Sequence, residues 1–135
     1  MSTDTDLLEQ AERANQRDEE QPDGDAYGYQ PVNWRTLAEA EQQVALEELA
    51  EWVTWLLERY PIKRATVPDC WQQHGWLIEE LSALHVGWLV CFDEQDSGLG
   101  PLQWHERFHQ FRERLHSWDG SCGTSGDNHR ADRAR

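Results

Sequence analysis

The sequence has few cysteines, no long apolar run and little positive charge, and each shortage excludes a class of protein. Its 135 residues include 3 cysteines, an odd number that argues against a disulfide framework and leaves metal binding or simple burial. No apolar run reaches the ~18 residues that a membrane span requires. The N-terminus also lacks the basic and apolar regions of a signal peptide, so we expect a cytoplasmic protein without a membrane partner.

Basic residues are scarce, at 12 against 26 acidic ones, and the formal net charge is −14. Half of this charge lies in residues 1–30. Such a balance repels nucleic-acid backbones and anionic membranes, so direct binding to either is not expected. A basic protein is the partner that the charge favours. A merely solvated acidic surface is the commoner origin of such charge, and mimicry of DNA is a further interpretation.

Several catalytic and nucleotide-binding patterns are also missing. The glycines beside the expected helices lack the Lys-Ser/Thr pair of a phosphate-binding loop, and no G-x-S-x-G nucleophile elbow occurs. The chain shows neither an internal repeat nor a stretch with the alternation of a strand. The sequence therefore favours a helical fold without a complete catalytic set.

Apolar periodicity predicts three helices. The most apolar stretch, residues 76–92, has a leucine-rich face and a second stripe of small residues, which places it in the middle of its domain. An earlier helix begins at a capping box, Thr36-Leu37-Ala38-Glu39, and runs towards Tyr60, where Pro61 ends it. A third helix spans residues 101–118, with a proline at its first position.

These elements predict an all-α fold, a small antiparallel bundle of three main helices. Residues 1–30 contain only Leu7 and Leu8 as strong apolar residues, so we expect a disordered acidic tail. The helical domain is predicted for residues 31–119. An irregular C-terminal segment, residues 120–135, follows it, and a metal ion would tie this segment to the domain.

Four residues carry the prediction of this metal site: Cys70, His74, Cys122 and His129. If the second and third helices are antiparallel and about equally long, the start of one lies beside the end of the other. Two thiolates and two imidazoles would then meet and form a closed structural zinc site. The alternative is that Cys70 is a small buried residue, His74 begins a helix, and the other two belong to a loose tail.

A second candidate site is the pattern His105-Glu106-Arg107-Phe108-His109, which matches the H-E-x-x-H motif of zinc metallopeptidases. In those enzymes the two histidines bind zinc and the glutamate acts as general base, so Glu106 would be catalytic. A third ligand is missing from the extension of the motif, where Leu115 stands in place of His. The many charged neighbours indicate a solvated helix face instead.

The stretch Pro68-Asp69-Cys70-Trp71-Gln72-Gln73-His74, with Leu81-Ser82-Ala83-Leu84 and Trp88 behind it, resembles a family of small actinobacterial proteins of unknown function. Such proteins tend to be encoded on plasmids, phages and integrative elements. The resemblance covers roughly residues 45–130, and Gly75 departs from it because the family usually carries Pro there. It implies an accessory role beside DNA transfer or maintenance machinery, and it offers no activity to carry over.

We therefore expect a non-enzymatic interaction protein of a mobile genetic element, stabilised by structural zinc and bound to a basic protein partner. The alternative is a zinc-dependent metallopeptidase that uses His105, Glu106 and His109.

Overall fold

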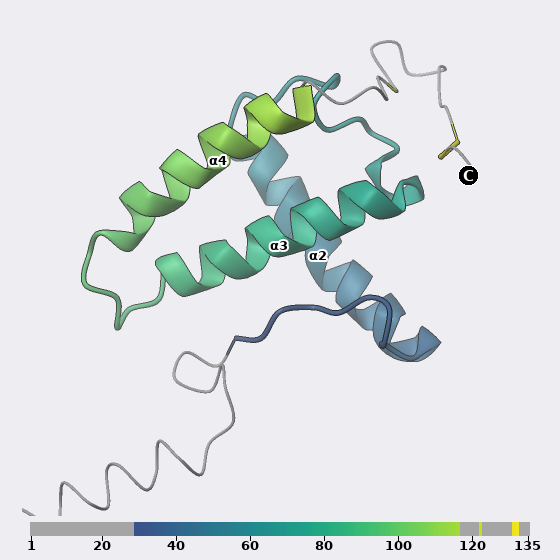
Figure 1. Ribbon diagram of the computed structural model, residues 1–135, viewed down its shortest axis with the longest axis horizontal. Helices are drawn as coiled ribbons and strands as arrows, with labels where there is room; N and C mark the ends of the chain where they lie inside the picture. The colour runs from purple at the N-terminus through teal and green to yellow at the C-terminus, as the bar shows by residue number, and fades with distance from the viewer. Residues whose placement is uncertain (1–28, 117–121, 123–130, 133–135) are drawn as a thin grey trace, which may run out of the picture. The chain divides into compact units, whose positions relative to one another are not determined.

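The computed structural model describes residues 29–116, 122 and 131–132. It contains three α-helices, α2 (Glu39–Arg59), α3 (Gly75–Cys91) and α4 (Gly100–His116), and a short 3₁₀ helix, η1 (Trp71–Gln73), before α3 (Figure 1). The described residues include no strand, so the predicted all-α fold with three main helices is confirmed. The chain divides into two units, Met1–Gln30 and Pro31–Arg135, and all three helices belong to the second. The predicted disordered tail lies almost entirely outside the described residues.

The sequence explains where the helices begin and end. α2 stops at Arg59 because Pro61, two residues later, has no amide hydrogen to continue the helix. Between α3 and α4, the Asp96 carboxylate accepts the N–H of Gly98 at 3.1 Å and that of Gly100 at 2.8 Å. Asp96 therefore satisfies backbone donors that the first turn of α4 cannot satisfy by itself.

The predicted capping box at residues 36–39 is wrong. Thr36 lies ahead of α2, and its hydroxyl donates to the carbonyl oxygen of Asn33 at 3.2 Å. The N-cap residue is Ala38, whose side chain forms no capping bond. The side-chain amide of Gln42 instead donates to two carbonyl oxygens of the segment before the helix, at 3.0 and 3.2 Å. Because Thr36 bonds to Asn33 in this turn, its hydroxyl does not cap α2.

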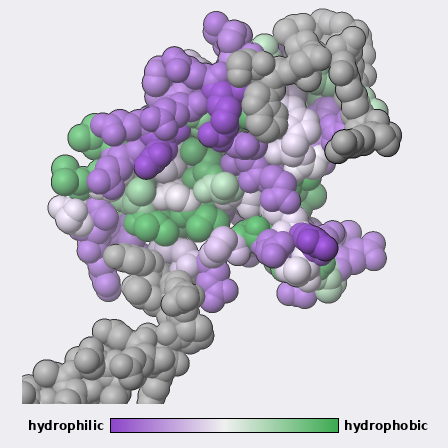
Figure 2. All heavy atoms as spheres, viewed as in Figure 1, coloured by the Kyte–Doolittle hydropathy of each residue, from purple (hydrophilic) through white to green (hydrophobic). Residues whose placement is uncertain are grey.

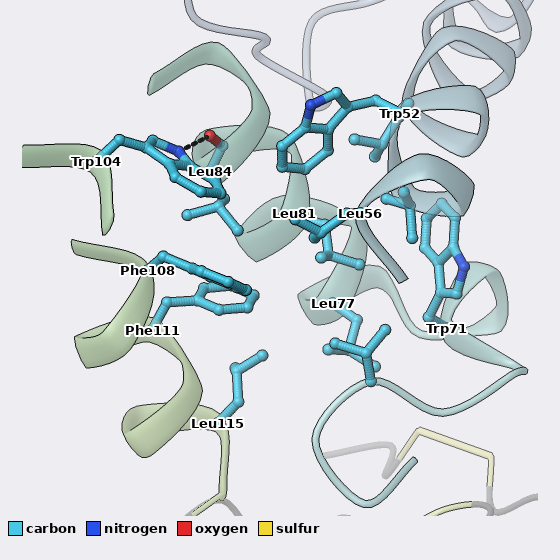
Figure 3. Close-up of a cluster of buried hydrophobic side chains, with 13 residues drawn as sticks. Trp52, Leu56, Trp71, Leu77, Leu81, Leu84, Trp104, Phe108, Phe111 and Leu115 are labelled. Carbon is cyan, nitrogen blue, oxygen red and sulfur yellow. Dashed lines mark hydrogen bonds between the residues drawn. The ribbon is translucent and has the colours of Figure 1, made fainter. Parts of the chain in front are cut away.

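Helix α3 packs against both of the other helices, as expected of a helix that is apolar on two sides. It runs antiparallel to α4 at its side, and α2 crosses behind the pair (Figure 1). The core forms where the three apolar faces meet (Figure 3). Its most deeply buried side chains are Val53, Leu56, Leu77, Leu81, Trp104 and Phe108.

Two polar contacts add to the apolar packing between α3 and α4. The indole N–H of Trp104 donates to the carbonyl oxygen of Leu84 at 3.1 Å within the core (Figure 3). At the surface, the Arg114 guanidinium forms an ion pair with Glu80. These contacts fix α4 along α3, so that the end of α4 lies near the start of α3.

Hydrophilic side chains gather over α4 on the face of the molecule that Figure 2 shows. None of the described helices combines the length and the apolarity needed to cross a membrane.

Candidate metal centre

Three of the four predicted metal ligands lie together at the start of α3. Cys70 immediately precedes η1, His74 lies between η1 and α3, and Cys122 comes from the C-terminal segment. Their ligand atoms all lie within 4.8 Å of one another, which is close enough to bind one metal ion. His74 and Cys122 are buried, and Cys70 is partly buried. The fourth predicted ligand, His129, lies outside the described residues.

The backbone around η1 fixes the distance between Cys70 and His74. The carbonyl oxygen of Cys70 accepts the N–H of Gln73 at 2.9 Å, and the N–H of His74 donates to the carbonyl oxygen of Trp71 at 3.1 Å. Trp71 is only 5% exposed and anchors this turn in the core. As a result, Cys70 Sγ lies 3.4 Å from His74 Nε2.

The separations suit a tetrahedral ion. When zinc binds sulfur at about 2.3 Å and nitrogen at about 2.1 Å, neighbouring ligand atoms are roughly 3.5 to 3.8 Å apart. The 3.4 Å distance between Cys70 Sγ and His74 Nε2, and the 4.8 Å limit for the whole group, require only small adjustments. Soft and borderline metal ions also prefer thiolate and imidazole ligands to hard oxygen ligands.

Sequence reasoning missed Asp132, which contacts the opposite side of the His74 ring. Its Oδ1 is 2.5 Å from His74 Nδ1, and its Oδ2 accepts the N–H of Gly75, the first residue of α3, at 3.1 Å. Asp132 is 58 residues away from His74 in the sequence, so no spacing pattern could have paired them. The one available signal was that Asp132 belongs to the same C-terminal segment as Cys122.

Burial and hydrogen bonds determine which groups of this site carry protons. Burial, together with the hydrogen bond with Cys122, raises the pKa of Cys70 to about 11. Burial lowers the pKa of His74, but hydrogen bonds with Asp132 and Cys122 outweigh it, so this pKa lies above 6.5. The hydrogen bond from His74 lowers the pKa of Asp132. A metal ion must therefore displace thiol protons when it binds.

The residues of the alternative site lie on the exposed face of α4. Nε2 of His105 is 2.9 Å from the Tyr60 hydroxyl, and Nε2 of His109 is 3.2 Å from the Glu113 carboxylate. Glu106 is exposed between them. Within the described part of the chain, these side chains do not belong to a group of three close metal-binding residues, whereas Cys70, His74 and Cys122 do.

No family model, curated protein or solved structure matches the chain. Its functional interpretation therefore rests on its own sequence and on the geometry of its residues.

Proposed function

We propose that the chain is a non-enzymatic accessory protein of a mobile genetic element, a zinc-stabilised acidic module that binds a basic protein partner. The convergence of Cys70, His74 and Cys122 on one point supports the zinc-stabilised part of this proposal. The resemblance of the sequence to small proteins of plasmids, phages and integrative elements supports the accessory role. A cytoplasmic location follows from both, because thiols stay reduced there and remain able to bind a metal.

Zinc is the ion that these ligands favour. Two thiolates and an imidazole suit a tetrahedral site, and a fourth protein ligand would close it against water. We propose His129 for that position, because it belongs to the same C-terminal segment as Cys122. A closed site of this kind contributes to folding and leaves no position for a substrate.

The zinc content of variants tests this assignment. Protein purified without a chelator should contain one zinc ion per chain, and Cys70→Ser and Cys122→Ser should each lose it. His105→Ala and His109→Ala are matched controls, because they remove imidazoles from α4 and should retain the metal. If the controls lose zinc while the cysteine variants keep it, the site on α4 is the correct one.

The partner surface proposed here is the exposed face of α2. This helix carries six glutamates and one basic residue, which is its last, Arg59. Trp55 lies on the same face, four residues after Glu51 and three before Glu58, and is 38% exposed. Its ring is 5.3 Å from that of Trp88 on α3. A segment with lysines or arginines beside apolar side chains would match both the charge and the aromatic surface.

Three of these glutamates, Glu47, Glu48 and Glu51, form no ion pair with any described residue and are exposed. Replacing all three with Gln changes the charge of α2 by three units without altering the core. A partner should therefore be retained by the wild-type chain and lost from this triple variant, in a pull-down from the native host at rising salt.

The matched control is a second triple variant with the same change of charge outside α2, at Glu79, Glu94 and Glu106, which are also exposed. The control should keep a basic partner whose binding weakens as the salt concentration rises. Equal losses from both triple variants would show that net charge, rather than the face of α2, determines binding. The absence of any basic, salt-sensitive partner would contradict the proposed function.

A further inference from the structure

The carboxylate of Asp132 contacts both the His74 ring and the first backbone N–H of α3. One oxygen lies at Nδ1 of His74, at 2.5 Å, and the other accepts the N–H of Gly75 at 3.1 Å. The His74 side chain is only 5% exposed, whereas that of Asp132 is 42% exposed. The carboxylate therefore reaches a buried imidazole from the surface and is held in place by the backbone of α3.

This contact determines which nitrogen of His74 can bind a metal ion. A neutral imidazole carries one proton, on either Nδ1 or Nε2, and a carboxylate can only accept a hydrogen bond. The proton of a neutral His74 therefore resides on Nδ1, which donates to Asp132. The lone pair of Nε2 then points towards Cys70 Sγ, which is 3.4 Å away. A metal ion would bind between these atoms and Cys122. Carboxylates that hold metal-binding histidines in this way are a general feature of metal sites.

We propose that Asp132 is the positioning residue of this metal centre, which keeps His74 in the Nδ1–H tautomer and its ring directed at Cys70 and Cys122. This inference rests on the proposed zinc site and names a residue that the ligand pattern does not include. Asp132 is not itself a ligand, because it occupies the nitrogen that points away from the two cysteines. The C-terminal segment thus supplies one ligand, Cys122, and the carboxylate that orients another.

The test compares the zinc affinity of full-length variants by competition with a chelator of known affinity at neutral pH. Asp132→Ala should bind zinc roughly 10- to 100-fold more weakly than the wild-type chain, the usual effect of removing such a partner. Asp132→Glu should recover part of the loss, because it restores a carboxylate. Glu79→Gln is the matched control, since it removes an exposed carboxylate from the first turns of α3 without touching His74.

A second readout separates positioning from a general loss of structure. In the metal-stripped wild-type chain, at a pH at which His74 is neutral, the nitrogen chemical shifts of the His74 ring should show a protonated Nδ1 and an unprotonated Nε2. In metal-stripped Asp132→Ala the neutral ring should populate both tautomers, while the far-ultraviolet circular dichroism still shows the helices. A variant that keeps the tautomer and binds zinc as tightly as Glu79→Gln would overturn the inference.

The backbone anchor provides an independent pair of variants. Gly75→Pro removes the N–H that donates to Asp132, and proline is tolerated at the first position of a helix. The extended backbone of His74, at φ −121° and ψ 106°, is also compatible with a following proline. Gly75→Ala keeps the N–H, and its added carbon would meet no heavy atom within 4 Å. Zinc should bind more weakly to the proline variant, and equal affinities would overturn the role of this anchor.

Different results would contradict the zinc site and the role of Asp132. If the wild-type chain binds no zinc, the proposed zinc-stabilised function is wrong. If the wild-type chain binds zinc through Cys70 and Cys122 but Asp132→Ala binds equally well, only the role of Asp132 is wrong.

Discussion

At the scale of single residues, His74 should give the metal-stripped and zinc-loaded chains opposite responses to pH. In the stripped chain, hydrogen bonds to Asp132 and Cys122 outweigh burial and raise the pKa of His74 above 6.5. A pKa that is higher in the folded state stabilises the fold below pH 6.5, and this contribution disappears as the pH rises through the folded pKa. In the loaded chain, zinc requires neutral His74 and deprotonated cysteines, so its contribution disappears as the pH falls.

His74→Gln should therefore destabilise the stripped chain more at low pH and the zinc-loaded chain more at high pH. Urea unfolding of both proteins, with and without zinc, between about pH 5.5 and 8 would measure the two differences around the ordinary pKa of histidine. The comparison between wild type and variant removes the titration of groups that do not contact His74, because these are common to both. Parallel pH profiles in the two metal states would contradict the prediction.

The three candidate ligands were more predictable from the sequence than Asp132, which contacts one of them. Antiparallel packing of two successive helices brings the start of the first near the end of the second, and this argument placed Cys70 and His74 beside Cys122. The same argument brings the C-terminal segment to the start of α3, but it does not indicate that Asp132 contacts the His74 ring and the Gly75 N–H. A side-chain contact between irregular segments leaves no periodic signal.

At the scale of elements, two helices begin with a glycine, and substitution should affect them differently. A Cβ at Gly100, the start of α4, would overlap the carbonyl oxygen of Cys91 and the carboxylate of Asp96. A Cβ at Gly75, the start of α3, would meet no heavy atom within 4 Å. The close approach at Gly100 is possible only without a side chain, because the last turn of α3 lies against it.

Gly100→Ala should lower the free energy of unfolding by about 1 to 3 kcal/mol, the usual cost of forcing an extra carbon into a packed site. Gly75→Ala should change the free energy of unfolding by less than about 1 kcal/mol. Alanine makes the unfolded chain less flexible, which favours the folded state. Urea denaturation of both variants with saturating zinc would measure the difference. Equal effects would mean that the turn between α3 and α4 relaxes to admit the methyl group.

Apolar periodicity predicted the extent of α3 and α4 better than the capping motif predicted the start of α2. The bounds of α3 and α4 fall within one or two residues of the expected ranges, since long runs of core residues determine them. The capping box failed because Thr36 bonds to Asn33 instead of the helix. Ser, Thr and Asn residues offer several local bonds of similar strength, and the sequence does not reveal which one forms.

At the scale of the whole molecule, the charge is distributed unevenly among the helices. Helix α2 contains six glutamates and one arginine, whereas α4 contains three arginines, at 107, 112 and 114. One of these, Arg114, is already paired with Glu80 of α3. The net charge of −14 therefore does not describe a uniform surface. If the proposed function is correct, the glutamates of α2 would orient a basic partner as well as attract it.

The size of the domain also bears on how strongly zinc should stabilise the fold. A domain of this size buries a modest core, and any ion that binds only the folded state adds to its stability. At a free zinc concentration 100 times the dissociation constant, the gain is about 2.7 kcal/mol. For a domain of 60 to 100 residues this corresponds to a rise of roughly 10 to 20 °C in Tm. The Tm should keep increasing with the logarithm of the zinc concentration.

Thermal unfolding of the full-length chain, first stripped with a chelator and then titrated with zinc, measures this rise. His105→Ala should follow the wild-type titration, because its imidazole contacts Tyr60 on a different part of the molecule. Cys122→Ser should show little dependence on zinc, because it removes the ligand that joins the C-terminal segment to the start of α3. If the Tm of the wild-type chain does not respond to zinc, Cys70, His74 and Cys122 are neighbours in the fold without being a structural metal site.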